Sequence, residues 1–326
     1  MNVSRRSFLQ GTAAAAAVAA VPTVAKGFAG TAPMSCPFRL SVINDEISQD
    51  FEHDCEVAAH DFGLSWIELR GMWKKNIADL NDKEVDDVKK ILAKYKLRVT
   101  DIASPLFKVD WPGAPPSKER ESHSAFNANV DLKKQDEVLA RCIAIAKALD
   151  TDRIRCFDFW RLEDQKPFRA AMDQKLREAA EVCEKNGMIL LLENEMSCNT
   201  ATGAEAARTL GAVKNKNFML NWDPGNAVAA GEVKAFPGGY DLLPKHRIGH
   251  CHCKDTVLKP GGGYEWAPVG GGVIDWAGQF RALVAQGYHH AVSLETHWHG
   301  GGTPEESTRI SMRGLKSVLS KDGLSC

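Results

Sequence analysis

The sequence has no apolar run long enough to span a membrane. The apolar stretch from Gly11 to Ala25 is made mostly of small residues and falls short of the roughly 20 residues that a transmembrane helix needs. The sequence also lacks an excess of positive charge, because 41 Lys and Arg stand against 42 Asp and Glu. We therefore predict that the protein has no stable membrane span once its amino-terminal signal, described below, is cleaved. We also predict no nucleic-acid partner.

The cysteines form no regular disulfide framework. There are nine of them, an odd number, and they are scattered along the chain. Several lie inside apolar runs, as Cys142, Cys156 and Cys183 do. We predict that most are buried as small apolar side chains. A lipid attached to Cys36, in "APMSC", is an alternative that the sequence leaves open.

What the sequence does have, at its start, is an export signal. "SRRSFLQ" places two arginines, Arg5 and Arg6, before a short stretch of small apolar residues. This order is typical of a twin-arginine signal peptide, although an alanine-rich surface helix is the alternative. We assign residues 1–30 to the signal peptide and a linker, with cleavage between Ala25 and Ala32. The mature protein is then periplasmic or secreted, and it is exported already folded.

Short β-rich segments alternate with helical ones through the rest of the chain. Helices are predicted at 51–62, 82–95, 131–149 and 166–186. The strands are predicted at 38–44, 65–71, 97–104, 152–160, 188–195, 217–226, 247–255 and 290–298. This alternation predicts a parallel sheet, and eight units favour a single closed (β/α)8 barrel over residues 36–322. An open doubly wound sheet is the alternative. No G-x-G-x-x-G follows an early strand, and we interpret "PGGGYEW" and "VGGGVIDW" as loops.

Polar side chains end the last four predicted strands. They are Glu193 in "LENE", Asp223 in "DPGN", His252 in "HCKD" and Glu295 in "LET". In a parallel barrel these strand ends meet at one face, where active sites form. Three carboxylates and one imidazole make a mixed oxygen and nitrogen set that suits Mn²⁺, Mg²⁺, Co²⁺ or Zn²⁺. We therefore predict one divalent metal ion at these four residues.

The segment "IGHCHCKD" decides which histidine belongs to that set. Alternate residues of a strand share a face, so His250, His252 and Lys254 point one way and the two intervening cysteines point the other. The cysteines are then packing residues. We predict His252 as the ligand, His250 as a hydrogen-bonded core residue one layer deeper, and Lys254 and Asp255 at the mouth, contacting substrate.

With "DPGN" and "HCKD" as its most specific motifs, the chain resembles the xylose isomerase-like barrel family of sugar-phosphate isomerases and epimerases. The resemblance covers nearly all of the mature chain. It implies that Glu193, Asp223, His252 and Glu295 hold the metal, for which we favour Mn²⁺. It also implies that Glu193 and Glu295 act as acid and base.

The resemblance implies an isomerase or epimerase that moves a proton on the carbon next to a carbonyl held by the metal. The substrate is then a small carbohydrate. Loss of a leaving group from the same intermediate gives the alternative, a lyase or dehydratase acting on a keto-sugar, glycoside or cyclitol. A non-catalytic exported sugar-binding barrel and an abasic-site endonuclease are further alternatives. The sequence leaves open whether the protein forms a homo-oligomer.

The sequence departs from the ketohexose epimerases at two positions. Asn226 stands where they carry histidine, and Leu258 stands where they carry arginine. Both departures put a free ketohexose substrate in doubt. Substrate contacts are then expected from Lys254, Asn226 and Glu195.

Three further residues lie at predicted strand ends and are candidates for substrate binding. Glu68, in "WIELRG", is predicted either to contact substrate or to pair with the neighbours of Arg70. Trp160 follows the fourth strand, where it can stack on a sugar ring or close the core. His297 shares the face of Glu295 if the strand continues that far.

Overall fold

A computed structural model describes residues 34–119 and 132–326. The predicted signal peptide, its cleavage region and the first residue of the helix predicted at 131–149 lie outside the described residues.

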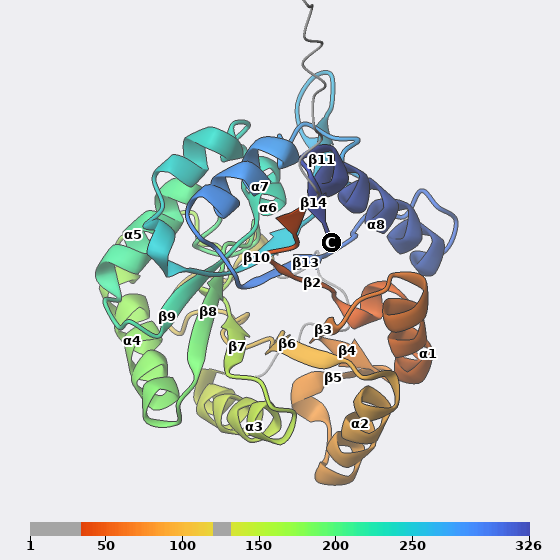
Figure 1. Cartoon of the computed structure of the whole chain (residues 1–326). Coiled ribbons are helices and arrows are strands. Elements are labelled where there is room, and N and C mark those ends of the chain that lie inside the picture. Colours follow the sequence, from red (N-terminus) through yellow and green to blue (C-terminus); the bar gives the residue numbers. More distant parts are fainter. Residues whose placement is uncertain (1–33, 120–131) are drawn as a thin grey trace, which may run out of the picture. The chain divides into compact units, whose positions relative to one another are not determined.

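Eight parallel strands form the central sheet (Figure 1). They are β2 (Arg39–Val42), β3 (Trp66–Leu69), β6 (Arg98–Ile102), β7 (Arg153–Cys156), β8 (Ile189–Glu193), β9 (Phe218–Trp222), β10 (Ile248–Cys253) and β13 (Ala291–Leu294). Their order in the sheet is β2-β13-β10-β9-β8-β7-β6-β3. A parallel bridge between Ile43 and Glu68 joins the two outer strands and closes the ring. This confirms the predicted (β/α)8 barrel.

Helices surround the strands, as Figure 1 shows in a view along the barrel axis. They are α1 (Phe51–Glu56), α2 (Asp82–Tyr95), α3 (Gln135–Ala148), α4 (Arg169–Lys185), α5 (Gly203–Ala212), α6 (Pro224–Ala229), α7 (Trp276–Ala285) and α8 (Pro304–Lys321). Local signals fix where several begin. Asn81 and Glu84 form a capping box at the start of α2, and Thr202 and Glu205 form one at α5. The core lies between the strands and these helices, where alternate strand residues such as Leu192 are fully buried.

Shorter helical segments complete the loops. A π-helical segment, Val57–Asp61, continues α1, and a second one covers Ala235–Gly239. Single 3₁₀ turns lie at Asn44–Glu46, Ile77–Asp79, Leu132–Lys134 and Lys245–Arg247. A small hairpin, β4 (Gly71–Met72) with β5 (Lys75–Asn76), follows β3.

The interpretation of "PGGGYEW" as a loop was wrong in part. Tyr264–Ala267 forms strand β12, which pairs antiparallel with β11 (Asp255–Leu258). The three glycines at 261–263 make the reversal possible, because their φ angles of +93°, +108° and +81° are open to glycine but strained for other residues. The resulting hairpin stands directly after β10, at the carboxyl end of the barrel.

We predicted that most cysteines are buried as small apolar side chains, and seven of the nine are. Cys55, Cys142, Cys156, Cys183, Cys198, Cys251 and Cys253 are buried free thiols. Cys36 and Cys326 instead form a disulfide between residues 290 positions apart. It lies beside a two-stranded parallel sheet of β1 (Met34–Ser35) and β14 (Leu324–Ser325). This disulfide uses the sulfur of Cys36 that a lipid would need, so it contradicts the lipid-attachment alternative.

Candidate active site

The four predicted metal ligands come together at the carboxyl end of the barrel. Glu193 ends β8, Asp223 follows β9, His252 lies near the end of β10 and Glu295 follows β13. One ligand atom from each lies within 4.8 Å of the others, and all four residues are buried. Four consecutive strands of the sheet therefore deliver three carboxylates and an imidazole to one point.

Asp223 owes its orientation to the start of helix α6. It is the N-cap of that helix, and its Oδ1 accepts a hydrogen bond of 2.8 Å from the backbone N–H of Asn226. Its own backbone N–H donates to Asn194 Oδ1 at 2.8 Å. With one oxygen committed to the cap, Oδ2 is the oxygen left to face the cluster. The "DPGN" motif thus positions a ligand and starts a helix at once.

The two ring nitrogens of His252 have different surroundings. Nδ1 lies 3.2 Å from Glu193 Oε1 and 3.3 Å from Glu295 Oε2, whereas Nε2 lies 3.0 Å from Glu68 Oε1. Burial lowers the pKa of His252, but the carboxylates of Glu68, Glu193 and Glu295 outweigh it and raise the pKa well above its usual value. The ring is therefore protonated when no cation is bound. Nδ1 faces the other predicted ligands, so a cation would replace its proton, whereas Nε2 donates its own proton to Glu68.

Glu68 lies beneath His252, away from the mouth. Its Oε2 is 3.1 Å from His250 Nε2, and its side chain is fully buried. Burial raises the pKa of Glu68, but the His252 and His250 rings lower it well below its ordinary value. Here Glu68 pairs with the two histidines, and His250 is a hydrogen-bonded core residue as predicted.

A strand irregularity extends this layer to Asp101. Ile67 of β3 pairs with Val99 of β6, yet Leu69 pairs with Ile102, so β6 carries one extra residue. The irregularity accompanies an inward-facing Asp101, whose Oδ1 is 3.4 Å from His250 Nδ1. Burial and the nearby Glu68 raise the pKa of Asp101 to about 6.

Two arginines that the sequence did not single out as site residues hold the two glutamates. Arg155 Nη1 lies 3.1 Å from Glu193 Oε2, and Arg70 Nη1 donates to Glu295 Oε1 at 2.9 Å. Arg70 also pairs with Asp45 Oδ1 at 2.8 Å. The sequence segment "RIRC" contained a signal for the role of Arg155, because two arginines alternate there with apolar residues in a fully buried strand.

Lys254 and Asp255 do not lie where we predicted them. Lys254 is fully buried, and its Nζ is 2.9 Å from Asp223 Oδ2 and 2.5 Å from Glu295 Oε2. Asp255 is also buried and accepts backbone hydrogen bonds from Gly270 and Gly272, at 3.0 and 3.1 Å. Strand β10 ends at Cys253, before the predicted end at residue 255, and both side chains point into the protein: the lysine enters the ligand cluster and the aspartate anchors the glycine loop.

Glu195 and Asn226 lie against the cluster. Asn226 Nδ2 donates to Glu193 Oε1 at 3.2 Å. Glu195 Oε2 lies 3.5 Å from Lys108 Nζ. Burial raises the pKa of Glu195, but Lys108 and Lys254 lower it to about 2, so this carboxylate is charged at neutral pH.

Aromatic side chains stand on two sides of the cluster. Trp160 is 1% exposed, and its ring centroid lies 5.4 Å from Lys108 Nζ. On the other side, the hairpin places the ring of Trp266 5.2 Å from the ring of His297 and 5.1 Å from Lys254 Nζ. His297 Nε2 is 3.4 Å from Glu295 Oε1. Trp266 was not predicted as a site residue, because the hairpin that presents it was interpreted as a loop.

Residues 57–318 match the family model described as xylose isomerase-like TIM barrel. The chain belongs to this family. Residues 2–22 match the signal sequence of the twin-arginine translocation pathway, so the protein is exported by that route to the periplasm or out of the cell. In the described part of the chain, none of the helices has the length and apolar character that crossing a membrane requires. A comparison with curated proteins finds no match.

Solved structures of other xylose isomerase-like barrels share this fold. The IOLI protein, crystallised with a zinc atom, is 19% identical over 87% of this chain and 99% of its own, with a TM-score of 0.67. A D-psicose 3-epimerase, crystallised in the presence of D-fructose, is 16% identical over 88% and 100%, with a TM-score of 0.61. The probable 3-DHS dehydratase AsbF of Bacillus anthracis is 18% identical over 86% and 99%, with a TM-score of 0.62.

The cluster of this xylose isomerase-like barrel fits a divalent cation. Glu193 Oε2 and Asp223 Oδ2 are buried and accept no well-aligned hydrogen bond from the described residues. Their nearest cations are Arg155 at 3.1 Å and Lys254 at 2.9 Å. Such oxygens have room for another positive partner, and oxygen donors with one imidazole suit hard or borderline divalent ions.

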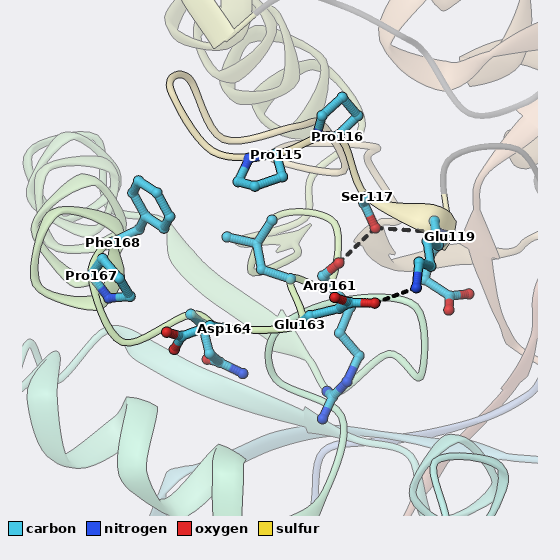
Figure 2. A pocket seen from close by; sticks show the side chains of 12 residues that line it. Pro115, Pro116, Ser117, Glu119, Arg161, Glu163, Asp164, Pro167 and Phe168 are labelled. Atoms are coloured by element: carbon cyan, nitrogen blue, oxygen red, sulfur yellow. Dashed lines mark hydrogen bonds and ion pairs between the residues drawn. The ribbon is translucent and has the colours of Figure 1, made fainter.

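A separate open pocket of about 780 Å³ lies between the loop after β6 and the loop after β7 (Figure 2). Pro115, Pro116, Leu162 and Phe168 contribute apolar walls. Arg161 borders it and is paired with Glu205 at 2.8 Å. None of the four predicted ligands lines this pocket, so it is distinct from the carboxylate cluster.

Proposed function

We propose that this protein is a divalent-metal-dependent sugar isomerase or epimerase. The observation that carries the proposal is the pair of glutamates, Glu193 and Glu295, which reach His252 Nδ1 from different strands at 3.2 and 3.3 Å. Glu193, Asp223, His252 and Glu295 would hold the ion, for which we favour Mn²⁺ over Mg²⁺, Co²⁺ or Zn²⁺, and the ion when bound supplies Lewis-acid polarisation of the substrate carbonyl.

The neighbouring cations prepare the glutamates to act as bases. Burial raises the pKa of Glu295, but Lys254, His297 and His252 lower it well below its ordinary value, so the carboxylate is ionised at neutral pH. The hydrogen bond from Arg70 fixes its other oxygen. Arg155 and Asn226 hold Glu193 in the same way. Glu295 is therefore charged before substrate arrives, and both carboxylates are held in fixed orientations.

The reaction needs only proton transfer between these groups and the substrate. One glutamate removes the proton from the carbon next to the carbonyl, and the bonding electrons move into the carbonyl to form an enediolate. The second glutamate, which enters this step as the carboxylic acid, gives its proton to the opposite face, which inverts that carbon and leaves the two glutamates with their protonation states exchanged. Return of the proton to the neighbouring carbon gives isomerisation instead. The Lys254 ammonium, which lies 2.9 Å from Asp223 Oδ2 and 2.5 Å from Glu295 Oε2, would donate a hydrogen bond to the developing oxyanion.

Lys254 also favours a second candidate, a lyase or dehydratase acting on a keto-sugar, glycoside or cyclitol. A buried ammonium 2.9 Å from Asp223 can stabilise a departing oxygen. The fold similarity to a probable dehydratase and the absence of a histidine at Asn226 agree with elimination. Elimination creates a conjugated carbonyl that absorbs ultraviolet light, which distinguishes it from isomerisation.

The first test is the metal content of the mature protein beside that of Asp223→Ala. We expect about one divalent ion per chain in the native protein and a marked loss in the variant. A carbohydrate screen in D2O then follows. Glu193→Gln should abolish deuterium incorporation while substrate binding persists, and the surface variant Glu178→Gln should behave like the native protein. Persistent turnover in Glu193→Gln would contradict the acid–base assignment, and a metal-free native protein would remove the basis of the mechanism.

A further inference from the structure

A cluster of basic side chains lies at the opposite end of the barrel. Arg39, Trp66, Arg98 and Arg153 are the first residues of β2, β3, β6 and β7, and His290 directly precedes β13. These five strands are neighbours in the closed sheet. Because the strands are parallel, their first residues meet at the end remote from the carboxylate site. We call these five residues the floor cluster.

Two arginines of the floor cluster share one indole ring. The guanidinium carbons of Arg39 and Arg98 lie 4.8 and 3.8 Å from the centroid of Trp66. A guanidinium stacked in this way uses its face and keeps the N–H groups at its edge available. Within residues 34–119 and 132–326, no carboxylate lies within ion-pair distance of either guanidinium.

Arg153 crosses the floor of the barrel. Its Nη2 lies 3.2 Å from His290 Nδ1, although β2, β3 and β6 separate β7 from β13 in the sheet. Arg153 is 5% exposed, and its Nε is buried without a hydrogen-bond partner. Its neighbour Asp152 pairs with its Nη1 but is half exposed. The guanidinium therefore presents a buried, unused donor close to the other cations.

The cations of the cluster repel one another. Burial, Arg153 and the adjacent His289 together lower the pKa of His290 to about 3, so the ring is neutral at physiological pH. Burial and Arg153 also lower the pKa of Arg39, and the Asp152 carboxylate offsets only part of this effect. An arginine rarely gives up its proton, so a bound anion relieves this repulsion.

We propose that the floor cluster binds a small oxyanion of the phosphate or sulfate type. The edge donors of Arg39 and Arg98 and the buried Nε of Arg153 provide several N–H groups, and guanidinium forks match such oxyanions. The His250 and Glu68 layer separates this site from the carboxylate cluster. The anion is therefore a structural ligand that stabilises the barrel without entering the reaction.

The test is calorimetric titration of the mature protein with sodium phosphate and, separately, sodium sulfate at constant ionic strength set by chloride. We expect saturable binding of one anion per chain and a matching rise in Tm. Arg98→Gln should weaken the affinity at least tenfold, and Arg39→Gln should do the same. The matched control is Arg313→Gln, which removes an exposed arginine of α8 that pairs with Glu306.

Arg98 is an exposed residue, so its substitution leaves the core intact, and the Tm of the variant in chloride alone checks this. The proposal fails if no saturable binding occurs. It also fails if Arg98→Gln and Arg39→Gln both bind the anion as tightly as the native protein, because the anion then occupies another site. Neither result bears on the proposed proton-transfer reaction, which metal analysis and deuterium exchange test separately.

Discussion

Replacing Glu68 with glutamine should weaken metal binding without removing a metal ligand. Glu68 is fully buried and lies 3.0 Å from His252 Nε2 and 3.1 Å from His250 Nε2. A carboxylate that accepts the remaining ring proton of a ligand histidine orients the ring and makes the other nitrogen a better donor. Loss of such a partner typically weakens metal affinity about 10–100-fold, or about 1.4–2.7 kcal/mol. The glutamine amide has the same shape and keeps one acceptor oxygen, so we expect the lower half of that range.

The assay is competition for Mn²⁺ or Zn²⁺ between the metal-free protein and a chelator of known affinity. Circular dichroism establishes that Glu68→Gln is folded, and the surface variant Glu178→Gln serves as the control. Saturating metal should restore most of the activity of Glu68→Gln. Unchanged metal affinity together with a raised KM would refute the reasoning, because it would make Glu68 a substrate contact.

Two further predictions concern stability. Breaking the Cys36–Cys326 disulfide, by reduction or as Cys36→Ser, opens a loop of 290 residues, for which chain entropy gives at most about 6 kcal/mol and roughly a 10 °C fall in Tm; equal melting curves with and without reductant would contradict this. His290 has a folded pKa of about 3, below the roughly 6.5 of an unfolded histidine, so the unfolded chain binds the extra proton and stability falls as the pH drops from about 6.5 toward 3. In denaturant titrations across that range, the free energy of unfolding of His290→Gln should depend less steeply on pH than that of the native protein. An identical pH dependence would refute the low pKa of His290.

Periodic patterns predicted most of the fold. The helix predicted at 82–95 coincides with α2, because Asn81 and Glu84 mark its start and the apolar spacing continues to its end. The fourth strand was predicted to end four residues too late, at residue 160, since the apolar run continues through Phe157 and Trp160 after β7 ends at Cys156. Those side chains are buried in a loop, and burial alone does not distinguish a loop from a strand.

The candidate site was predictable to the extent that strand ends are visible in the sequence. Glu193 and Asp223 close apolar runs and stand out for that reason. The roles of Arg155 and Glu68 depend on which strands face each other across the barrel. A local sequence pattern does not contain this information. The Cys36–Cys326 pair was missed for the same reason, because only the completed barrel brings these two residues together.

The disulfide makes a covalent macrocycle of the polypeptide between its two cysteines. A single proteolytic cut in a surface loop, such as the glycine turn at 261–263, would therefore leave both pieces joined through the sulfur–sulfur bond. Because the disulfide holds β1 and β14 together, these two strands could also be joined by a peptide linker. The chain could then be opened at the glycine turn instead, and the order of the strands around the barrel axis would not change. Outside the cytoplasm, where the protein meets proteases, a nicked ring of this kind can keep its barrel assembled.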